Sequence, residues 1–474
     1  MRLYERLARD LEGLIRDGTL GPGARAPSIR AFCRERAASP ASVTRAYELL
    51  EARGILVSRA RSGFFVAGIA PTPSPPPETR VPDHLDVSQL VFQILEATRV
   101  RDCVPLGSAF PSPELFPLRQ LGRHLAFVAQ HLDPWSTIED LPPGSLTLRK
   151  QIAHRYRVGG AEVSPEEIVI TAGGLEALNL ALQVVTAPND IVAIESPSFY
   201  GCLQAIERAG RQAVEIPTTP EHGLDLDALD RTLQLVPVKA CWFMTTFHNP
   251  LGAIMPAASK ERLAKTLAAG EIPLIEDNVY TELYFGRNRP RITKVWDRKG
   301  LILDCGSFAK TLAPGYRLGW VAAGRFASAV RKNKITTSLA TSIPIQAAIS
   351  RYLATGVYDR HLARLRRTLE KQQKRLISAL GMYFPPQCSW DSPVGGYQLW
   401  VRLPAGANAL DLHARALRHN ISVAPGPMFS ARREFSRAIR LNYGHPWTAA
   451  TERAIKTLGE LIKRQCAQAA EQQR

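Results

Sequence analysis

The sequence predicts two folding units, a small helical head that ends in a hairpin and a large α/β body with a mostly parallel sheet. Three observations lead to this fold class. The chain has 474 residues, which is long for a single domain. Short apolar runs alternate with helical patterns through much of the chain. A proline-rich stretch separates a short basic segment from everything that follows it.

The head is predicted to contain three helices and a two-stranded wing. Apolar residues from Tyr4 to Leu14 recur at helical spacing, and a second short helix is expected to start at Pro27 in PSIRAFCRER. Ser39 is a good N-cap for a third helix, ASVTRAYELLEARG, which Gly54 ends. The run ILVSRARSGFFVA then alternates in polarity, as a hairpin does.

The boundary between the two units is the stretch IAPTPSPPPETRVPDH, which contains six prolines and no apolar periodicity. Proline-rich segments are extended and semi-rigid and do not form a core. We therefore expect a head at residues 1–68, a linker at 69–84 and the body at 85–474.

The body repeats a strand followed by a helix. EIVIT precedes GGLEALNLALQVV, DIVAIES precedes FYGCLQAIERAG, and ACWFMTTF precedes SKERLAKTLAAG, after which PLIEDNVY, LILDCGSF and LGWVAAG read as strands. Repeated units of this kind predict a mostly parallel sheet with helices on both faces. Beyond about residue 340 the pattern becomes more helical, and a smaller α+β region from GGYQLWVRLP to AIRLNYG closes the chain.

Charge and cysteine usage narrow the functional classes. The net charge is +17, which fits either a polyanion-binding protein or a basic soluble surface. The seven cysteines form no CxxC pair, so we expect reduced thiols, no metal site and no disulfide framework. The N-terminus lacks a signal-peptide pattern and no apolar run is long enough to span a bilayer, so we expect a cytoplasmic protein without a membrane partner.

A helix pair followed by a hairpin has a known mechanical use. The second helix enters the major groove of DNA and the wing lies along the backbone. Residues 1–70 carry 12 arginines against seven acidic residues. The candidate DNA contacts are Arg30, Ser39, Ser42, Arg45, Arg59 and Arg61. The same pattern also fits a helical domain with solvated arginines or a dimerisation module.

One lysine in the body has an unusual setting. Lys310 follows the apolar run LILDC and lies among small residues in GSFAKTLAPGYRLGW. Most lysines are solvated surface charges, but a desolvated amine has a lowered pKa and can form a Schiff base with an aldehyde. Pyridoxal 5'-phosphate presents such an aldehyde, and it needs further groups that can be sought in the sequence.

Candidate residues for the phosphate group lie on both sides of that lysine in the sequence. Ser307 and Arg317 flank Lys310 and could donate to phosphate. Gly173, Gly174 and Leu175 lie where a strand turns into a helix, whose first N–H groups attract anions. A Gly-Gly turn also commonly just connects two elements.

The pyridine ring would need three kinds of partner. A carboxylate keeps the ring nitrogen protonated, and Asp277 ends the apolar run PLIED at the edge of the sheet where α/β sites form. Asn249 in HNPLG and Tyr280 suit the phenolic oxygen, and Phe199 could cover the ring face. Each residue has a plainer reading, as a helix cap, a turn or core packing.

The joint order of these residues resembles fold-type I aminotransferases over roughly residues 105–470. The segments SFAKTLAPGYRLGW, EDNVYTELYF and HNPLG carry the resemblance. It implies that Lys310 holds pyridoxal phosphate as a Schiff base, with Asp277 and Tyr280 as further catalytic groups. It also implies that Arg440 in AIRLNYG grips a substrate carboxylate, and that Gly107 and Ser108 in PLGSAFP pass over the substrate.

The head resembles the GntR-type winged helix-turn-helix from Tyr4 to Val66, along GPGARAPSIRAFCRERAASPASVTRAYELLEARGILVSRARSGFFV. The chain has Ala26 where that family usually has leucine, and Pro40 where it often has arginine. The second departure removes a DNA contact, so the operator sequence cannot be transferred.

Head, linker and body in this order resemble the MocR subgroup of GntR regulators. The resemblance implies a transcription factor that binds promoter DNA and pyridoxal phosphate, forms a homodimer and senses an amino compound or the cofactor itself. Two alternatives stay open from the sequence. One is a metabolic aminotransferase with an accessory DNA-binding head, and the other is a decarboxylase or lyase on the same fold. Retention of Lys310, Asp277 and Arg440 predicts at least a transamination half-reaction.

Overall fold

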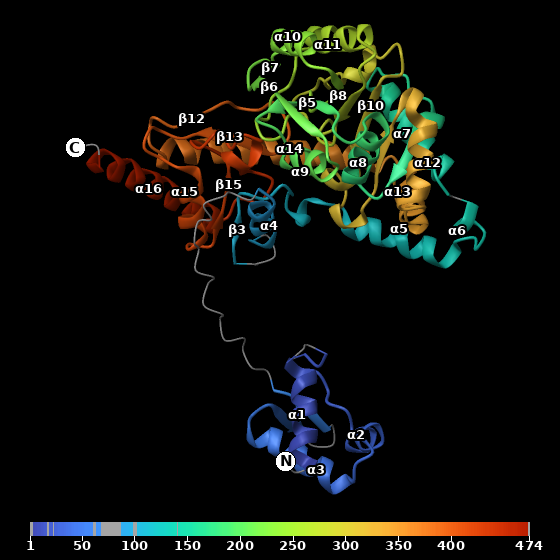
Figure 1. Cartoon of the computed structure of the whole chain (residues 1–474), viewed down its shortest axis with the longest axis vertical. Helices are drawn as coiled ribbons and strands as arrows, with labels where there is room; N and C mark the ends of the chain where they lie inside the picture. Colours follow the sequence, from blue (N-terminus) through green and yellow to red (C-terminus); the bar gives the residue numbers. More distant parts are fainter. Residues whose placement is uncertain are drawn as a thin grey trace. The chain divides into compact units, whose positions relative to one another are not determined.

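The computed structural model describes residues 3–16, 19–21, 23–59, 63–67, 87–97, 102–139 and 141–472 (Figure 1). The chain divides into two compact units at residue 81. The predicted linker at 69–84 lies outside the described residues.

The head contains the three helices and the hairpin that the sequence predicts. They are α1 (Leu3–Arg16), α2 (Ile29–Arg36), α3 (Pro40–Ala52), β1 (Leu56–Arg59) and β2 (Gly63–Val66). Ser39 caps α3, because its Oγ accepts the Ser42 amide at 3.3 Å. Helix α2 begins after Ser28 rather than at Pro27, because the Ser28 Oγ accepts the Ala31 amide at 3.2 Å and serves as the N-cap.

A compact core holds the head together. Leu7 and Leu11 of α1 pack with Phe32 of α2 and Tyr47 of α3, and all four side chains are buried. The Tyr47 hydroxyl donates to the Pro27 carbonyl at 2.8 Å, so the one polar atom of this aromatic side chain is satisfied. Ala26, one of the two departures from the GntR pattern, is also part of this core.

The body is built on an eight-stranded sheet with the order β4-β11-β10-β9-β8-β5-β6-β7. The strands are β4 (Ile168–Thr171), β5 (Ile191–Ser196), β6 (Gln212–Thr219), β7 (Gly223–Leu224), β8 (Val238–Phe243), β9 (Leu274–Asp277), β10 (Ile302–Ser307) and β11 (Gly319–Ala322). Strands β11 and β7 pair antiparallel with their neighbours, and the other pairings are parallel. The predicted fold class is confirmed. The sequence reading did not identify β6, β7 or the helix that follows them.

Helices cover both faces of this sheet (Figure 1). They include α5 (Leu118–His131), α7 (Leu146–Val158), α8 (Gly174–Val185), α9 (Tyr200–Arg208), α10 (Leu226–Leu235), α11 (Ala257–Ala269), α12 (Ala327–Thr337) and α13 (Ile343–Ala354), with the short α6 (Ser136–Glu139) after α5. Alternation along β5 shows the two faces: Val192 and Ile194 pack with α8 and α9, whereas Ala193 packs with α10 and α11. Because the strands are buried on both faces, they read as continuous apolar runs.

The C-terminal part forms a smaller α+β subdomain, coloured orange to red in Figure 1. Its antiparallel sheet has the order β12 (Ser389–Trp390), β13 (Gln398–Arg402), β16 (Ala438–Asn442) and β15 (Ala424–Pro425). Helices α14 (Val357–Tyr383), α15 (Ala409–Leu417) and α16 (Ala449–Gln472) pack on it, and β14 (Ile421–Ser422) pairs with β3 (Val104–Pro105). Helix α4 (Val87–Ala97) packs against α9 and the turn after β15.

No helix among the described residues combines the length and the apolar character that crossing a membrane requires.

The packing of the head predicts the effect of two matched substitutions in α1. Leu11 is fully buried and Leu3 is 43% exposed. We expect Leu11→Ala to lower the unfolding free energy of the head by about 2–5 kcal/mol, and Leu3→Ala by less than about 0.5 kcal/mol. Hydrogen exchange of head peptides in the full-length protein measures both values. Equal effects of the two substitutions would contradict the packing of α1.

Candidate functional site

A cavity of about 250 Å³ opens at the edge of the sheet where β9 and β10 end side by side. Its wall includes nine of the residues predicted from the sequence, namely Gly174, Leu175, Phe199, Asn249, Asp277, Tyr280, Ser307, Lys310 and Arg317. Parallel strands bring their carboxyl ends to one edge, where α/β proteins form ligand sites. The fold therefore gathers side chains that are scattered over residues 174–317.

Lys310 ends a short helical turn that directly follows β10. Its Nζ donates a hydrogen bond to the Ala109 carbonyl at 2.8 Å and lies 4.3 Å from the centre of the Phe110 ring. Burial lowers the pKa of Lys310 to about 7; nearby arginines lower it further and the Asp277 carboxyl opposes both effects. Near neutral pH much of this amine is uncharged, and the uncharged amine is the form that attacks an aldehyde.

Asp277, at the end of β9, is 2% exposed. Within the described part of the chain its carboxyl accepts one hydrogen bond, from the Val279 amide to Oδ1 at 3.3 Å. Burial raises the pKa of Asp277 to about 7, although the Val279 amide and the Lys310 amine both lower it. A buried carboxyl with a spare oxygen suits a cationic partner, such as a protonated ring nitrogen.

The turn before α8 forms a tight cradle at another side of the cavity. Gly173 has φ +94°, and a Cβ there would lie 2.6 Å from Arg317 Nη2. A Cβ on Gly319 would lie 2.5 Å from the Gly173 carbonyl carbon. Only glycine allows these segments to approach so closely. Arg317 donates to the Ala172 carbonyl at 3.1 Å, so its guanidinium is held at the first turn of α8, where free N–H groups attract phosphate.

Tyr280 and Asn249 add polar groups to the wall, and the Tyr280 ring centre lies 5.7 Å from Lys310 Nζ. The Tyr280 hydroxyl accepts from Gln398 Nε2 at 3.1 Å, and burial raises the pKa of Tyr280. Asn249 Oδ1 accepts from Arg440 Nη1 at 3.0 Å, which leaves Nδ2 available to an acceptor in the cavity. Phe199 precedes α9 with its ring half-buried, 4.8 Å from that of Tyr200.

Arg440 on β16 lies beside this cavity but does not line it. It is fully buried, and no acidic side chain of the described residues forms an ion pair with it. Its Nη2 donates to the Gly107 carbonyl at 2.6 Å, and its Nε has no partner. Ser108 does not line the cavity either. Its Oγ accepts a hydrogen bond from the Phe110 amide at 3.0 Å, within its own turn. The roles predicted for Arg440, Gly107 and Ser108 stay predictions.

The sequence reading missed several residues of the cavity wall. Ala109 and Phe110 contact Lys310 from the segment in which only Gly107 and Ser108 were predicted. Tyr397 donates to the same Ala109 carbonyl at 2.9 Å. The glycine pair before Tyr397 was the available signal, because Gly395 and Gly396 come shortly before the apolar strand QLWVR. The wall also includes Tyr200, Met244, Gln204 and, from α4, Val91.

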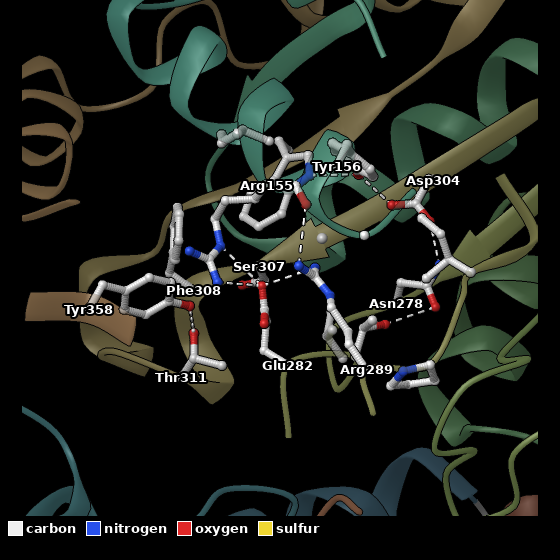
Figure 2. A pocket seen from close by; sticks show the side chains of 18 residues that line it. Arg155, Tyr156, Asn278, Glu282, Arg289, Asp304, Ser307, Phe308, Thr311 and Tyr358 are labelled. Atoms are coloured by element: carbon white, nitrogen blue, oxygen red, sulfur yellow. Dashed lines mark hydrogen bonds and ion pairs between the residues drawn. The ribbon is translucent and has the colours of Figure 1, made fainter. Parts of the chain in front are cut away.

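Ser307 also lines a second, smaller pocket of about 60 Å³, and Figure 2 shows the polar lining of this pocket. Asp304 accepts short hydrogen bonds from Tyr156 and Asn278, and Trp320 Nε1 donates to the Tyr156 hydroxyl at 2.9 Å. Burial and the neighbouring Glu276 raise the pKa of Asp304 to about 7. This network ties the loop after β9 to β10, the two strands that precede Asn278 and Lys310 in the chain.

The head exposes part of the predicted DNA-contacting set. Arg30 and Arg45 are exposed, and the Arg45 guanidinium lies 5.1 Å from the Tyr4 ring centre. Ser39 and Ser42 share a hydrogen bond of 3.0 Å between their hydroxyls at the start of α3. The side chain of Arg59 and the whole of Arg61 lie outside the described residues.

The cavity matches the requirements of pyridoxal phosphate group by group. An uncharged amine suits the aldehyde, a buried carboxyl with a free oxygen suits the ring nitrogen, and a glycine cradle with an arginine suits the phosphate. These features define an aminotransferase-like cofactor site.

Comparison with known proteins identifies the family. Residues 141–458 match the family of class I and II aminotransferases, and residues 3–66 match the gntR family of bacterial regulatory proteins. The chain thus belongs to the MocR-type regulators, in which a GntR head is fused to an aminotransferase domain. The predicted resemblance is confirmed, and so is pyridoxal 5'-phosphate as the cofactor.

The relatives support this assignment along the whole chain. The chain is 45% identical to the uncharacterized HTH-type transcriptional regulator YdcR of Escherichia coli, over 98% of this chain and 99% of that one. It is 35% identical to YjiR of the same organism, again over 98% and 99%. Among solved structures, LysN of Thermus thermophilus, an α-aminoadipate aminotransferase bound to a phosphopyridoxyl-leucine, aligns with TM-score 0.73 and 27% identity over 80% of this chain and 95% of that one.

The lowered pKa of Lys310 predicts how cofactor attachment depends on pH. Only the uncharged amine reacts, so the rate at which the cofactor-free protein takes up pyridoxal phosphate should rise about tenfold per pH unit below the pKa and level off above about pH 8. Stopped-flow absorbance measures this rate. A rate that keeps rising beyond pH 9 would show that Lys310 behaves as an ordinary solvated lysine.

Proposed function

We propose that this protein is a transcriptional regulator whose aminotransferase-like body holds pyridoxal phosphate covalently through Lys310 and senses an amino compound or the cofactor itself. One observation carries the proposal. The desolvated amine of Lys310 and the buried carboxyl of Asp277, which accepts only one hydrogen bond from the described residues, line the same cavity, and the same chain carries a GntR head. A regulator that binds promoter DNA must be in the same compartment as the chromosome, so we propose that the protein is cytoplasmic.

The residues that would hold the cofactor have separate tasks. Lys310 would bond the aldehyde carbon, Asp277 would pair with the ring nitrogen, and Ser307 and Arg317 would receive the phosphate together with the first turn of α8. Bound in this way, pyridoxal phosphate would supply an electrophilic carbon that an incoming amine can attack, and a protonated ring that withdraws electrons from the attached amine. The uncharged form of Lys310 Nζ can accept a proton at this position.

Arg440 gives the sensed molecule a second recognition point. A buried guanidinium without an acidic partner is electrostatically costly, and a carboxylate is its best complement. Its bonds to Asn249 Oδ1 and the Gly107 carbonyl hold it in place, and Asn249 connects it directly to the cavity wall. We therefore propose an amino acid as the effector, in keeping with the leucine adduct bound to LysN.

Helix α4 offers a path from the cavity toward the linker. Val91 of α4 lies on the cavity wall, and Gln204, another wall residue, donates to Ser88 of α4 at 3.0 Å. Helix α4 is the first described element of the body after the linker. An effector that binds two arrangements of α4 with different affinity would shift their populations, which is the only way a ligand can change the state of the head.

We further propose that the protein is a homodimer. Large apolar side chains are exposed along one stretch of the body, including Leu118, Phe127, Trp135, Ile138 and Leu141. Apolar surface of this kind marks interaction sites in soluble proteins. A dimer would present two heads and would need paired or repeated DNA half-sites.

A metabolic aminotransferase is the second candidate function, because Lys310, Asp277 and Tyr280 lie on one cavity wall and provide acid–base groups for transamination. The discriminating experiment is a gel shift with DNA from upstream of the gene, using protein with and without pyridoxal phosphate and an amino acid panel. A regulator shows sequence-preferring, salt-sensitive binding whose affinity changes with the ligand, and Lys310→Ala abolishes that change. Binding without sequence preference would support the enzyme instead.

The exposed arginines of the head allow a direct check of the DNA-binding surface. We expect Arg30→Ala or Arg45→Ala to weaken promoter binding and to reduce the slope of log affinity against log salt by about 1, because each removes a phosphate contact. Arg16→Ala, at the end of α1, removes the same charge outside this surface and should leave the slope unchanged. If all three substitutions act alike, net charge rather than contact geometry controls binding.

A further inference from the structure

We propose that the body contains a second ligand site, separate from the cofactor cavity, that binds a small organic amine in its cationic form. The site is a cavity of about 490 Å³ between the segment around β3, helix α14 and the start of α16. It is far larger than one water molecule requires, about 10–15 Å³. It shares no lining residue with the cofactor cavity.

An unpartnered buried side chain marks this cavity as a ligand site. Gln372 of α14 lines it and is 7% exposed, yet its Oε1 has no hydrogen-bond partner. A buried polar atom left unpaired costs about 1–3 kcal/mol. Oε1 itself is shielded in this conformation, so a ligand would remove this cost only by drawing the Gln372 amide toward the cavity and donating a hydrogen bond to it.

The charges around the cavity select a cation. Two carboxylates, Asp102 and Glu114, lie on the wall, and no lysine or arginine does. Neither carboxylate forms a hydrogen bond or ion pair through its side chain within the described part of the chain. The remaining candidate for positive charge is His445, whose pKa is lowered by burial, although the Phe110 carbonyl and Glu114 oppose this. The wall is therefore negative near neutral pH.

The other walls favour an apolar body on the amine. Leu106, Leu376, Pro446 and Trp447 line the cavity. The start of α16 also borders it. Two of its first four N–H groups are already engaged by Thr448, whose Oγ1 accepts the Thr451 amide at 3.2 Å and whose carbonyl accepts the Glu452 amide at 3.0 Å. This reduces the number of N–H groups that an anion could use there.

Residues 104–110 run from the amine site to the cofactor cavity. Val104, Pro105 and Leu106 line the amine site, while the next residues reach the cofactor side, where the Gly107 carbonyl bonds Arg440 and the Ala109 carbonyl bonds Lys310. Asn442 lines the amine site, and its Nδ2 donates to the Ser108 and Phe110 carbonyls at 2.9 and 2.7 Å. A ligand that moves this segment would change the surroundings of Lys310.

The test uses N,N-dimethyl-2-phenylethylamine, a tertiary amine that cannot condense with the cofactor aldehyde. Calorimetry on the full-length holoprotein should show one saturable site per chain. The uncharged 2-phenylethanol and the anionic 3-phenylpropionate should bind at least tenfold more weakly. Asp102→Asn with Glu114→Gln should weaken amine binding at least tenfold, whereas Glu221→Gln, an exposed carboxylate elsewhere, should leave it unchanged.

Two further variants keep the test decisive. Gln372→Leu should weaken amine binding. Ala450→Trp, at an exposed position on the rim, should block the cavity, and it provides a test even if Gln372→Leu does not fold. Lys310→Ala should still bind the amine, which separates this site from the proposed cofactor function. Absence of saturable binding, a preference for the anion, or binding that survives Ala450→Trp and the double variant would overturn the proposal.

Discussion

The central constraint in the body is that a desolvated amine, Lys310, and a buried carboxyl, Asp277, line the same cavity. Lys310 and Asp277 lose solvation on folding, which draws both of their pKa values toward about 7. The parallel pairing of β9 and β10 sets this arrangement, because Asp277 and Cys305 are register partners and Lys310 is the third residue after the end of β10. A cofactor with an aldehyde and a cationic ring nitrogen satisfies both groups.

The rest of the fold keeps these two groups in place. The Tyr156–Asp304–Asn278 network in Figure 2 anchors the loop after β9, and the contact of Gly173 with Gly319 and Arg317 fixes the other end of the cavity. The segment after β3 closes the remaining side by offering the Ala109 carbonyl to Lys310. That segment also lines the second cavity. Ligands bound in the two cavities would therefore contact neighbouring residues of one backbone segment.

Local signals in the sequence predicted much of this arrangement. The cap at Ser39, the apolar runs and the glycine pair at 173–174 are short-range patterns, and the structure contains each of them. Strands β6 and β7 were missed, because only the alternation in QAVEIPTT marks them. Ala109 and Gln372 could not be predicted, since their roles arise from contacts between residues hundreds of positions apart. Arg317 was predicted from its position near Lys310, but its bond to Ala172 depends on the left-handed backbone at φ +48°.

The proposed sensing function requires that the body carry its cofactor at the predicted lysine, Lys310. The most direct measurement is borohydride reduction of the protein saturated with pyridoxal phosphate, followed by protease digestion and peptide mass mapping. The account predicts one phosphopyridoxyl group, on the peptide that contains Lys310. A modification mapped to other lysines, or none at all with excess cofactor present, would contradict it.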